Sequence, residues 1–312
     1  MTRLIPIESI PNSLWSKQES TLRLPLQVTE IWSQILENNE LTNQAKQKAP
    51  DRIIGGMSKK DTDDFLAWRF PGSSAKVILT VLDPNDDLPQ IPDTFARIFS
   101  GNKVFMADLP CGSGTASLNI LSVFYELRKI NAIPRMPLNV VVLGGEISEH
   151  ARGYADESLK ALQEKLEEQA IFLEFSTHHW DVCNQLSNSD LVKEINIRSH
   201  ECSSKLIYMS HFSGFLEKEK KWRDAQAQFG EVFRHFRSDN SIVLWLEPDM
   251  KAVTRDNGFF PRLIKWFSQA FSQYFNREAK NKKYVGFAEK MKTGFNANLG
   301  SYPMVACDNC CS

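Results

Sequence analysis

Apolar residues follow two different periods that alternate along the chain from residue 104 onward. Short continuous apolar runs predict strands that are buried on both faces. Between these runs, apolar residues recur every three or four positions, as they do on one face of a helix. Strands that alternate with helices predict a parallel sheet with right-handed crossovers and helices on both faces. The predicted strands are 104–109, 139–146, 171–181, 205–210 and 242–248.

The two ends of the chain depart from this alternation. Near the N-terminus, apolar residues at helical spacing predict an amphipathic helix over residues 26–41, which would pack on a larger body. A shorter helix follows, and we expect Pro71-Gly72 to stop it. Near the C-terminus, residues 260–275 predict another helix, and residues 282–307 predict two strands around a turn.

Together, these elements predict the fold class. We expect an α/β fold with a doubly wound, mostly parallel, seven-stranded sheet, an antiparallel C-terminal hairpin and an N-terminal helical extension. Residues 1–72 would form the extension, which could act as a lid, and residues 73–312 would form the sheet domain. A chain of 312 residues can bury one sizeable core with such an addition.

Composition and charge restrict the classes of partner. Apolar residues make up 42% of the chain and charged residues 24%, as in ordinary globular proteins. A formal net charge of −1 gives no overall attraction to nucleic acid, so such a partner would need a local basic patch. No apolar run approaches the roughly 18 residues of a membrane span, and the N-terminus lacks a secretory apolar region. We therefore expect a cytoplasmic protein with no membrane partner and with its six cysteines as thiols.

A glycine turn, Asp-Leu-Pro-Cys-Gly-Ser-Gly-Thr at residues 108–115, separates the first predicted strand from its helix. In an open parallel sheet, this turn lies at the edge where ligands bind. Gly112 and Gly114 would let the backbone approach a ligand, and the helix N-terminus offers free N–H groups. A phosphate-binding P-loop is excluded because this turn lacks the lysine that such a loop requires. A dinucleotide fingerprint is matched only in part, because Ser117 stands where its third glycine should be.

This turn resembles the first motif of class I S-adenosylmethionine-dependent methyltransferases, in the variant Asp-x-Pro-Cys-Gly-x-Gly. The resemblance implies a Rossmann-like methyltransferase domain over residues 73–312, with S-adenosylmethionine as cofactor and partner. It also implies that the loop backbone holds the methionine part of the cofactor, while the acid orders the loop and contacts the amino group. Proline stands where the first glycine of the motif is usual. The residues assigned to the cofactor in this motif are Asp108, Pro110, Cys111, Gly112 and Gly114.

Acidic residues at the ends of the next two predicted strands extend the resemblance. In this family, an acid that closes the second strand binds both ribose hydroxyls, which implies that role for Glu146. An acid and an apolar residue after the third strand bracket the adenine, which implies that role for Asp181 and Val182. Simpler roles fit the same residues. Glu146 could be a solvated acid at a strand end, and Asp181 could cap the following turn.

The end of the fourth predicted strand is where the methyl acceptor meets the cofactor in this family. His211 and Ser210 are the candidate catalytic residues there, because a histidine can take a proton from a nucleophilic nitrogen or oxygen. A histidine that only hydrogen-bonds the backbone is the alternative. The stretch has neither an Asn/Asp-Pro-Pro-aromatic motif nor a cysteine. These absences argue against N6-adenine, glutamine and cytosine C5 chemistry and leave direct transfer to oxygen or nitrogen.

These residues predict a methyltransferase whose acceptor, unidentified by the sequence, could be RNA or protein. Two other classes stay open: a methyltransferase-fold binding or assembly module without catalysis, and an NAD-dependent oxidoreductase on the same kind of sheet. No resident metal is expected. Cys307, Cys310 and Cys311 have only half the ligand spacing of a zinc site. His178 and His179 are adjacent in a predicted strand and would point to opposite faces.

Overall fold

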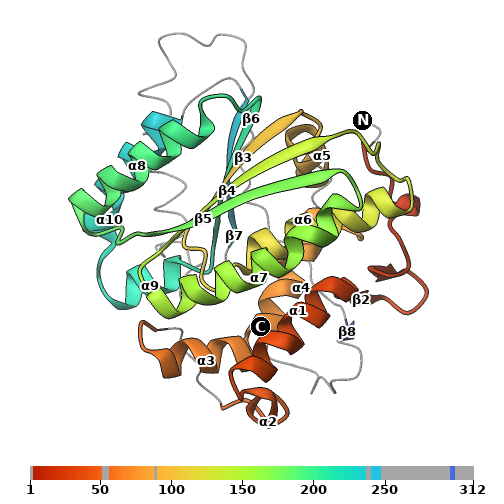
Figure 1. The fold of residues 1–312 in the computed structure, drawn as a ribbon, viewed down its shortest axis with the longest axis horizontal. Coiled ribbons are helices and arrows are strands. Elements are labelled where there is room, and N and C mark those ends of the chain that lie inside the picture. The colour runs from red at the N-terminus through yellow and green to blue at the C-terminus, as the bar shows by residue number, and fades with distance from the viewer. Residues whose placement is uncertain (1–2, 51–55, 88–89, 237–239, 247–295, 299–312) are drawn as a thin grey trace.

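The fold is built around a parallel sheet of five strands in the order β5-β4-β3-β6-β7 (Figure 1). The computed structural model describes residues 3–50, 56–87, 90–236, 240–246 and 296–298. Each pair of neighbouring strands in this sheet is parallel, as the alternation of strands and helices predicts. The strands are β3 (Lys103–Asp108), β4 (Leu138–Glu146), β5 (Ile171–His179), β6 (Ser204–Ser210) and β7 (Ser241–Leu246).

The middle strand, β3, fixes where a ligand site can form. Its register pairs Asp108 with Gly144 of β4 on one side and with Tyr208 of β6 on the other. The strand order therefore reverses between β3 and β6, which makes this the topological switch point of the sheet. The C-terminal ends of parallel strands meet at one edge, so Asp108 and Glu146, which end β3 and β4, lie at the same edge.

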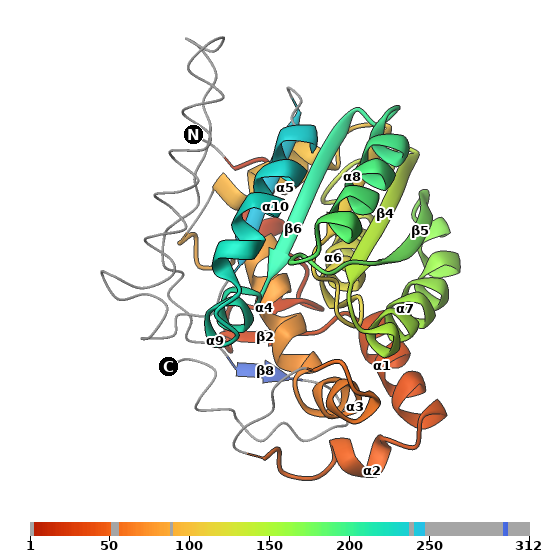
Figure 2. The ribbon, with the colours of Figure 1, turned by 90° about the vertical axis from the view of Figure 1, so that its left-hand side faces the viewer.

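Helices cover both faces of the sheet (Figures 1 and 2). One face packs against α5, α6 and α7 together with the N-terminal helices α1 and α4, and the other packs against α8 and α10. Their apolar stripes explain this. In α10, for example, Ala225, Phe229, Val232 and Phe236 are buried at helical spacing. The helices are α1 (Leu26–Asn38), α2 (Thr42–Ala45), α3 (Lys59–Trp68), α4 (Phe70–Leu82), α5 (Gln90–Ile98), α6 (Thr115–Lys129), α7 (Glu149–Glu167), α8 (Gln185–Ser199), α9 (Ser213–Lys218) and α10 (Trp222–Phe236), with a short 3-10 helix η1 (Ile7–Ser9).

The N-terminal segment belongs to the same hydrophobic cluster as the first face of the sheet. Trp32 of α1 stacks on Phe70 of α4, with 6.1 Å between the ring centroids. The predicted stop at Pro71-Gly72 is wrong: α3 ends at Trp68, and Pro71 lies in the first turn of α4. A proline is tolerated there because the N–H that it lacks would have no partner within the helix.

The predicted seven-stranded sheet is not found. Most of the predicted C-terminal hairpin, and the helix predicted over 260–275, lie outside the described residues. The described part of the hairpin, β8 (Asn296–Asn298), is not in the central sheet but pairs in parallel with β2 (Thr21–Arg23). With β1 (Trp15–Ser16), which is antiparallel to β2, it forms a second sheet of three strands. The N-terminal extension therefore contains short strands as well as helices. Among the described helices, none is long and apolar enough to cross a lipid bilayer.

Candidate functional site

The glycine loop between β3 and α6 lies at the carboxyl edge of the sheet, beside the switch point. Two backbone hydrogen bonds hold it. The Cys111 N–H donates to the Gly145 carbonyl oxygen at 3.0 Å, and the Gly114 N–H donates to the Cys111 carbonyl oxygen at 2.8 Å. The Leu109–Pro110 peptide bond, at the start of the loop, is cis. The loop is thus tied to β4 and closed on itself before the helix begins.

Gly112 and Gly114 have the same kind of backbone but different surroundings. Their φ angles are 51° and 76°, in the left-handed region that favours glycine. A Cβ atom on Gly114 would lie 3.1 Å from the Cα atom of Ala155 in α7, whereas one on Gly112 would meet nothing within 4 Å. Gly114 therefore allows α7 to pack on the loop, and Gly112 leaves a side of the backbone open to a ligand.

Glu146, at the end of β4, lies against this loop. Its Oε2 accepts a hydrogen bond from the Gly112 N–H at 3.2 Å, and its Oε1 accepts one from the Ser148 N–H at 2.9 Å. Burial raises the pKa of this carboxyl, while the backbone hydrogen bonds and the charge of Arg152 oppose the rise. A carboxylate offers about four acceptor positions. Glu146 therefore retains acceptor capacity at the open side of the loop.

Asp108 is turned inward, under the first turn of α6. Its Oδ2 accepts hydrogen bonds from the Ser117 N–H at 3.1 Å and from the Ser117 hydroxyl at 2.7 Å. Its Oδ1 is buried and accepts from no group in the described part of the chain. Burial raises the pKa of this carboxyl to about 7, against the two Ser117 bonds, and the charge of Glu146 adds to the rise. Asp108 thus occupies the anion-binding position that the α6 N-terminus would otherwise offer.

The surroundings of the loop are negatively charged. Burial raises the pKa of the Cys111 thiol well above its ordinary value, and the carboxylates of Asp108, Glu146 and Asp156 raise it further. Arg152 opposes them, but its guanidinium donates to backbone carbonyl oxygens at the end of β4 rather than to a carboxylate. Cys111 is therefore a buried, unreactive thiol. The carboxylates of Glu146 and Asp156 make the site more favourable to a cation than to a phosphate, whereas Asp108, with a pKa of about 7, carries only part of a charge at neutral pH.

Asp181 and Val182 follow β5 at the same edge but are engaged within the protein. Asp181 Oδ1 accepts a hydrogen bond from the Cys183 N–H at 2.9 Å, which stabilises its own turn. The Asp181 N–H donates to the Ser187 hydroxyl at 2.9 Å. Val182 is 3% exposed and belongs to a hydrophobic cluster with Trp180. The structure therefore gives these residues a role in the loop itself, and their contact with adenine stays a prediction.

His211 directly follows Ser210, the last residue of β6. Its φ is 55°, and its N–H donates to the Leu246 carbonyl oxygen of β7 at 3.0 Å. Its Nε2 is buried and has no hydrogen-bond partner among the described residues. Burial lowers the pKa of His211 to about 4, and the charge of Lys76 in α4 contributes. The imidazole is therefore neutral at neutral pH. Lys76 does not follow a strand, and its only signal in the sequence is that it is the single charged residue of α4.

The N-terminal segment reaches the glycine-loop side of this edge through α3. The Thr62 and Ser148 hydroxyls lie 3.4 Å apart, at the turn that follows Glu146. The Tyr154 hydroxyl of α7 donates a hydrogen bond to the Asp63 carboxylate of α3. The segment predicted as a lid is therefore attached to α7 next to the glycine loop.

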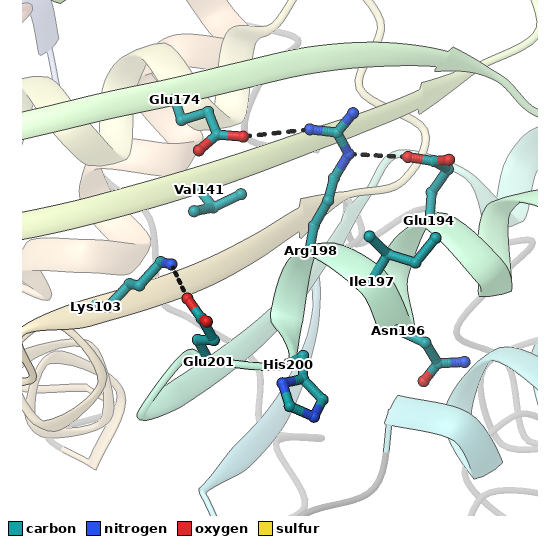
Figure 3. A pocket seen from close by; sticks show the side chains of 9 residues that line it. All are labelled: Lys103, Val141, Glu174, Glu194, Asn196, Ile197, Arg198, His200 and Glu201. Carbon is teal, nitrogen blue, oxygen red and sulfur yellow. Dashed lines mark hydrogen bonds and ion pairs between the residues drawn. The ribbon is translucent and has the colours of Figure 1, made fainter.

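A separate groove lies at the opposite, amino-terminal edge of the sheet (Figure 3). Its charged side chains are paired with one another. The Lys103 Nζ atom lies 3.0 Å from a carboxylate oxygen of Glu201. Nitrogen atoms of the Arg198 guanidinium lie 3.4 Å from a carboxylate oxygen of Glu174 and 3.0 Å from one of Glu194. Because ligands of open parallel sheets bind at the carboxyl edge, and because these charges already neutralise one another, the glycine loop is the better candidate site.

Within the described ranges, no group of three or more His, Cys, Asp and Glu side chains could hold a metal ion. The C-terminal cysteines Cys307, Cys310 and Cys311 lie outside those ranges. No protein-family model matches the chain, and no curated protein matches it. The functional case therefore rests on the site's own residues.

Proposed function

We propose that the protein is an S-adenosylmethionine-dependent methyltransferase that transfers a methyl group to an oxygen or nitrogen atom. The observation that carries this proposal is the pair of carboxylates around the open side of the glycine loop: Glu146, hydrogen-bonded to the Gly112 N–H at 3.2 Å, and Asp156 of α7. S-adenosylmethionine brings two cationic groups, a sulfonium and an ammonium. Nicotinamide dinucleotides bring a pyrophosphate, which the same carboxylates would repel. The charge of the loop therefore supports the first cofactor over the second.

The residues at the loop fit such a cofactor. Gly112 leaves its backbone open, and Glu146 retains acceptor capacity for ribose hydroxyls. The buried Oδ1 of Asp108, which has no partner in the described structure, would accept a hydrogen bond from an ammonium N–H group. When bound, the cofactor supplies an electrophilic methyl group on its sulfur. The protein's own contribution is to align the acceptor with that methyl group, and His211 is neutral and able to accept the proton that the acceptor loses.

Calorimetric titration of the purified protein with S-adenosylmethionine and, separately, with NADH tests this proposal. We expect S-adenosylmethionine to bind, and Gly112→Arg to abolish binding because the new side chain would fill the open side of the loop. Glu146→Ala would weaken it. Gly153→Ala is the matched control, because a Cβ at Gly153 in α7 also meets nothing within 4 Å. If the intact protein gives no heat with S-adenosylmethionine, the methyltransferase proposal fails. A signal with NADH would instead favour the oxidoreductase.

A further inference from the structure

The outward face of α4 carries two cations without carboxylate partners. The residues of α4 that are not buried are Gly72, Ser73 and Lys76, and Arg69 directly precedes the helix. These four positions have the i, i+3, i+4, i+7 spacing of one helix face. Within the described ranges, neither the Arg69 nor the Lys76 side chain has an ion pair or hydrogen bond. We call these four residues the α4 face.

The lysines of the preceding helix, unlike Arg69 and Lys76, are paired with carboxylates. In α3, the Lys59 Nζ atom lies 2.8 Å from Asp63 Oδ2, and the Lys60 Nζ atom lies 2.6 Å from Asp64 Oδ2. Those lysines are exposed, whereas Lys76 is partly buried. A cation that loses hydration without gaining an anion carries a free-energy cost. A partly buried cation without a partner is therefore a favourable place for an anion from outside the chain.

The α4 face lies beside the proposed acceptor site. In Figure 2, the carboxyl end of β6 is directed toward α4. Lys76 acts electrostatically on His211, which follows that strand and whose Nε2 is buried without a partner in the described part of the molecule. The helix is also fixed in place, because Asn119 of α6 donates a hydrogen bond to the Ser74 hydroxyl at 2.9 Å. An anion on this face would thus lie next to the proposed proton acceptor.

We propose that the α4 face, beside His211, binds a phosphate group of the methyl acceptor, supplied by single-stranded RNA or by a free nucleotide. The identification as acceptor rests on the proposed function, whereas the phosphate site itself does not. Arg69 and Lys76 are separated by about 10 Å along the helix axis, so they can contact more than one phosphate of a strand. A chain with a net charge of −1 needs such a local basic patch to attract a nucleic acid.

Fluorescence anisotropy with a labelled single-stranded RNA tests this site, using the full chain and the variants Arg69→Gln and Lys76→Gln. We expect each variant to weaken RNA binding about tenfold and to lower the slope of log affinity against log salt by about 0.7. Lys60→Gln is the matched control, because that lysine is paired with Asp64 and 82% exposed. Lys76→Arg is expected to restore most of the affinity. Calorimetry with S-adenosylmethionine should give the same affinity in all of these variants.

Competition experiments separate the two sources of the phosphate. RNA binding that depends on Lys76 supports a strand as acceptor. Binding of adenosine monophosphate with the same dependence, without RNA binding, supports a free nucleotide. The inference is overturned if neither ligand binds, if Arg69→Gln and Lys76→Gln leave their affinity unchanged, or if only an acidic peptide binds. If S-adenosylmethionine does not bind while RNA binding still depends on Lys76, the proposed function fails and the phosphate site stands.

Discussion

Replacing Asp108 by asparagine is expected to change the stability of the protein in a way that depends on pH. The Asp108 side chain is buried, and its pKa is raised from an ordinary value of 3.8 to about 7. The folded protein therefore holds a proton on this carboxyl more tightly than the unfolded chain does. This difference in proton affinity sets the direction in which stability changes with pH. Stability is greatest below the unfolded pKa of 3.8 and decreases as the pH rises toward about 7.

The size of this loss of stability follows from the same two pKa values. A rise from 3.8 to about 7, at about 1.4 kcal/mol per pKa unit, corresponds to about 4 kcal/mol lost when the carboxyl is ionised in the folded state. About 2 kcal/mol of this loss falls between about pH 5.5 and about pH 8.5. For a chain of 312 residues, that is about 3 °C in the unfolding midpoint. An asparagine can still accept both Ser117 hydrogen bonds, but its amide nitrogen would replace an oxygen that has no partner in the described structure. That cost, about 1–3 kcal/mol, does not change with pH.

Urea unfolding of both proteins at about pH 5.5 and about pH 8.5 measures this effect. We expect the free energy of unfolding of Asp108→Asn, relative to the unmodified protein, to increase by about 2 kcal/mol between the two conditions. Glu167→Gln, which replaces an exposed carboxylate in the last turn of α7, is the control for the loss of one charge. The reasoning is refuted if the difference between Asp108→Asn and the unmodified protein is the same at both pH values.

Three further predictions concern the loop and the residues around it. Gly112→Ala should lower the free energy of unfolding by about 1 kcal/mol through its left-handed backbone alone. Gly114→Ala should lower it more, because its Cβ would also crowd Ala155. Urea unfolding ranks the two variants, and equal losses of stability would contradict the packing of α7 on the loop. Glu146→Gln should weaken S-adenosylmethionine binding about tenfold in calorimetry, and an unchanged affinity would remove Glu146 from the site. His211→Asn tolerates a φ of 55° but has no proton-accepting nitrogen. It should reduce methyl transfer, measured with a labelled methyl group, at least about 100-fold without changing cofactor affinity. An undiminished rate would exclude a proton-accepting role.

The three inner strands of the central sheet, β3, β4 and β6, could be predicted from the sequence because they are largely buried on both faces. The predicted strand 139–146, for example, corresponds to β4 (Leu138–Glu146), and its continuous apolar run has no surface position to interrupt it. The second sheet could not be predicted in this way. Strand β8 has three residues and pairs with β2, far away in the sequence. A local pattern of side chains does not specify such a distant partner, so the sequence could not predict that β8 would lie outside the central sheet.

The same distinction applies to the candidate site. Gly112 and Glu146 meet in a hydrogen bond of 3.2 Å because they follow neighbouring parallel strands, and the alternation of strands and helices predicted that both would lie at the carboxyl edge of the sheet. Lys76 acts electrostatically on His211 only because α4 packs against the sheet. No spacing rule connects a residue in an N-terminal helix with the end of β6. Pro71-Gly72 also indicated a stop, since the same two residues can either end a helix or begin one.

The two proposals divide the carboxyl edge of the sheet by charge. Glu146 and Asp156 make the side of the glycine loop negative, whereas Lys76 makes the side that contains His211 positive. A cationic cofactor and an anionic acceptor would therefore each bind where the protein's own charges favour them. The division also affects the proton acceptor. A phosphate bound near Lys76 would offset the positive charge that helps to lower the pKa of His211. His211 would then become a stronger base when the acceptor arrives, which links proton acceptance to the presence of the group that must lose the proton.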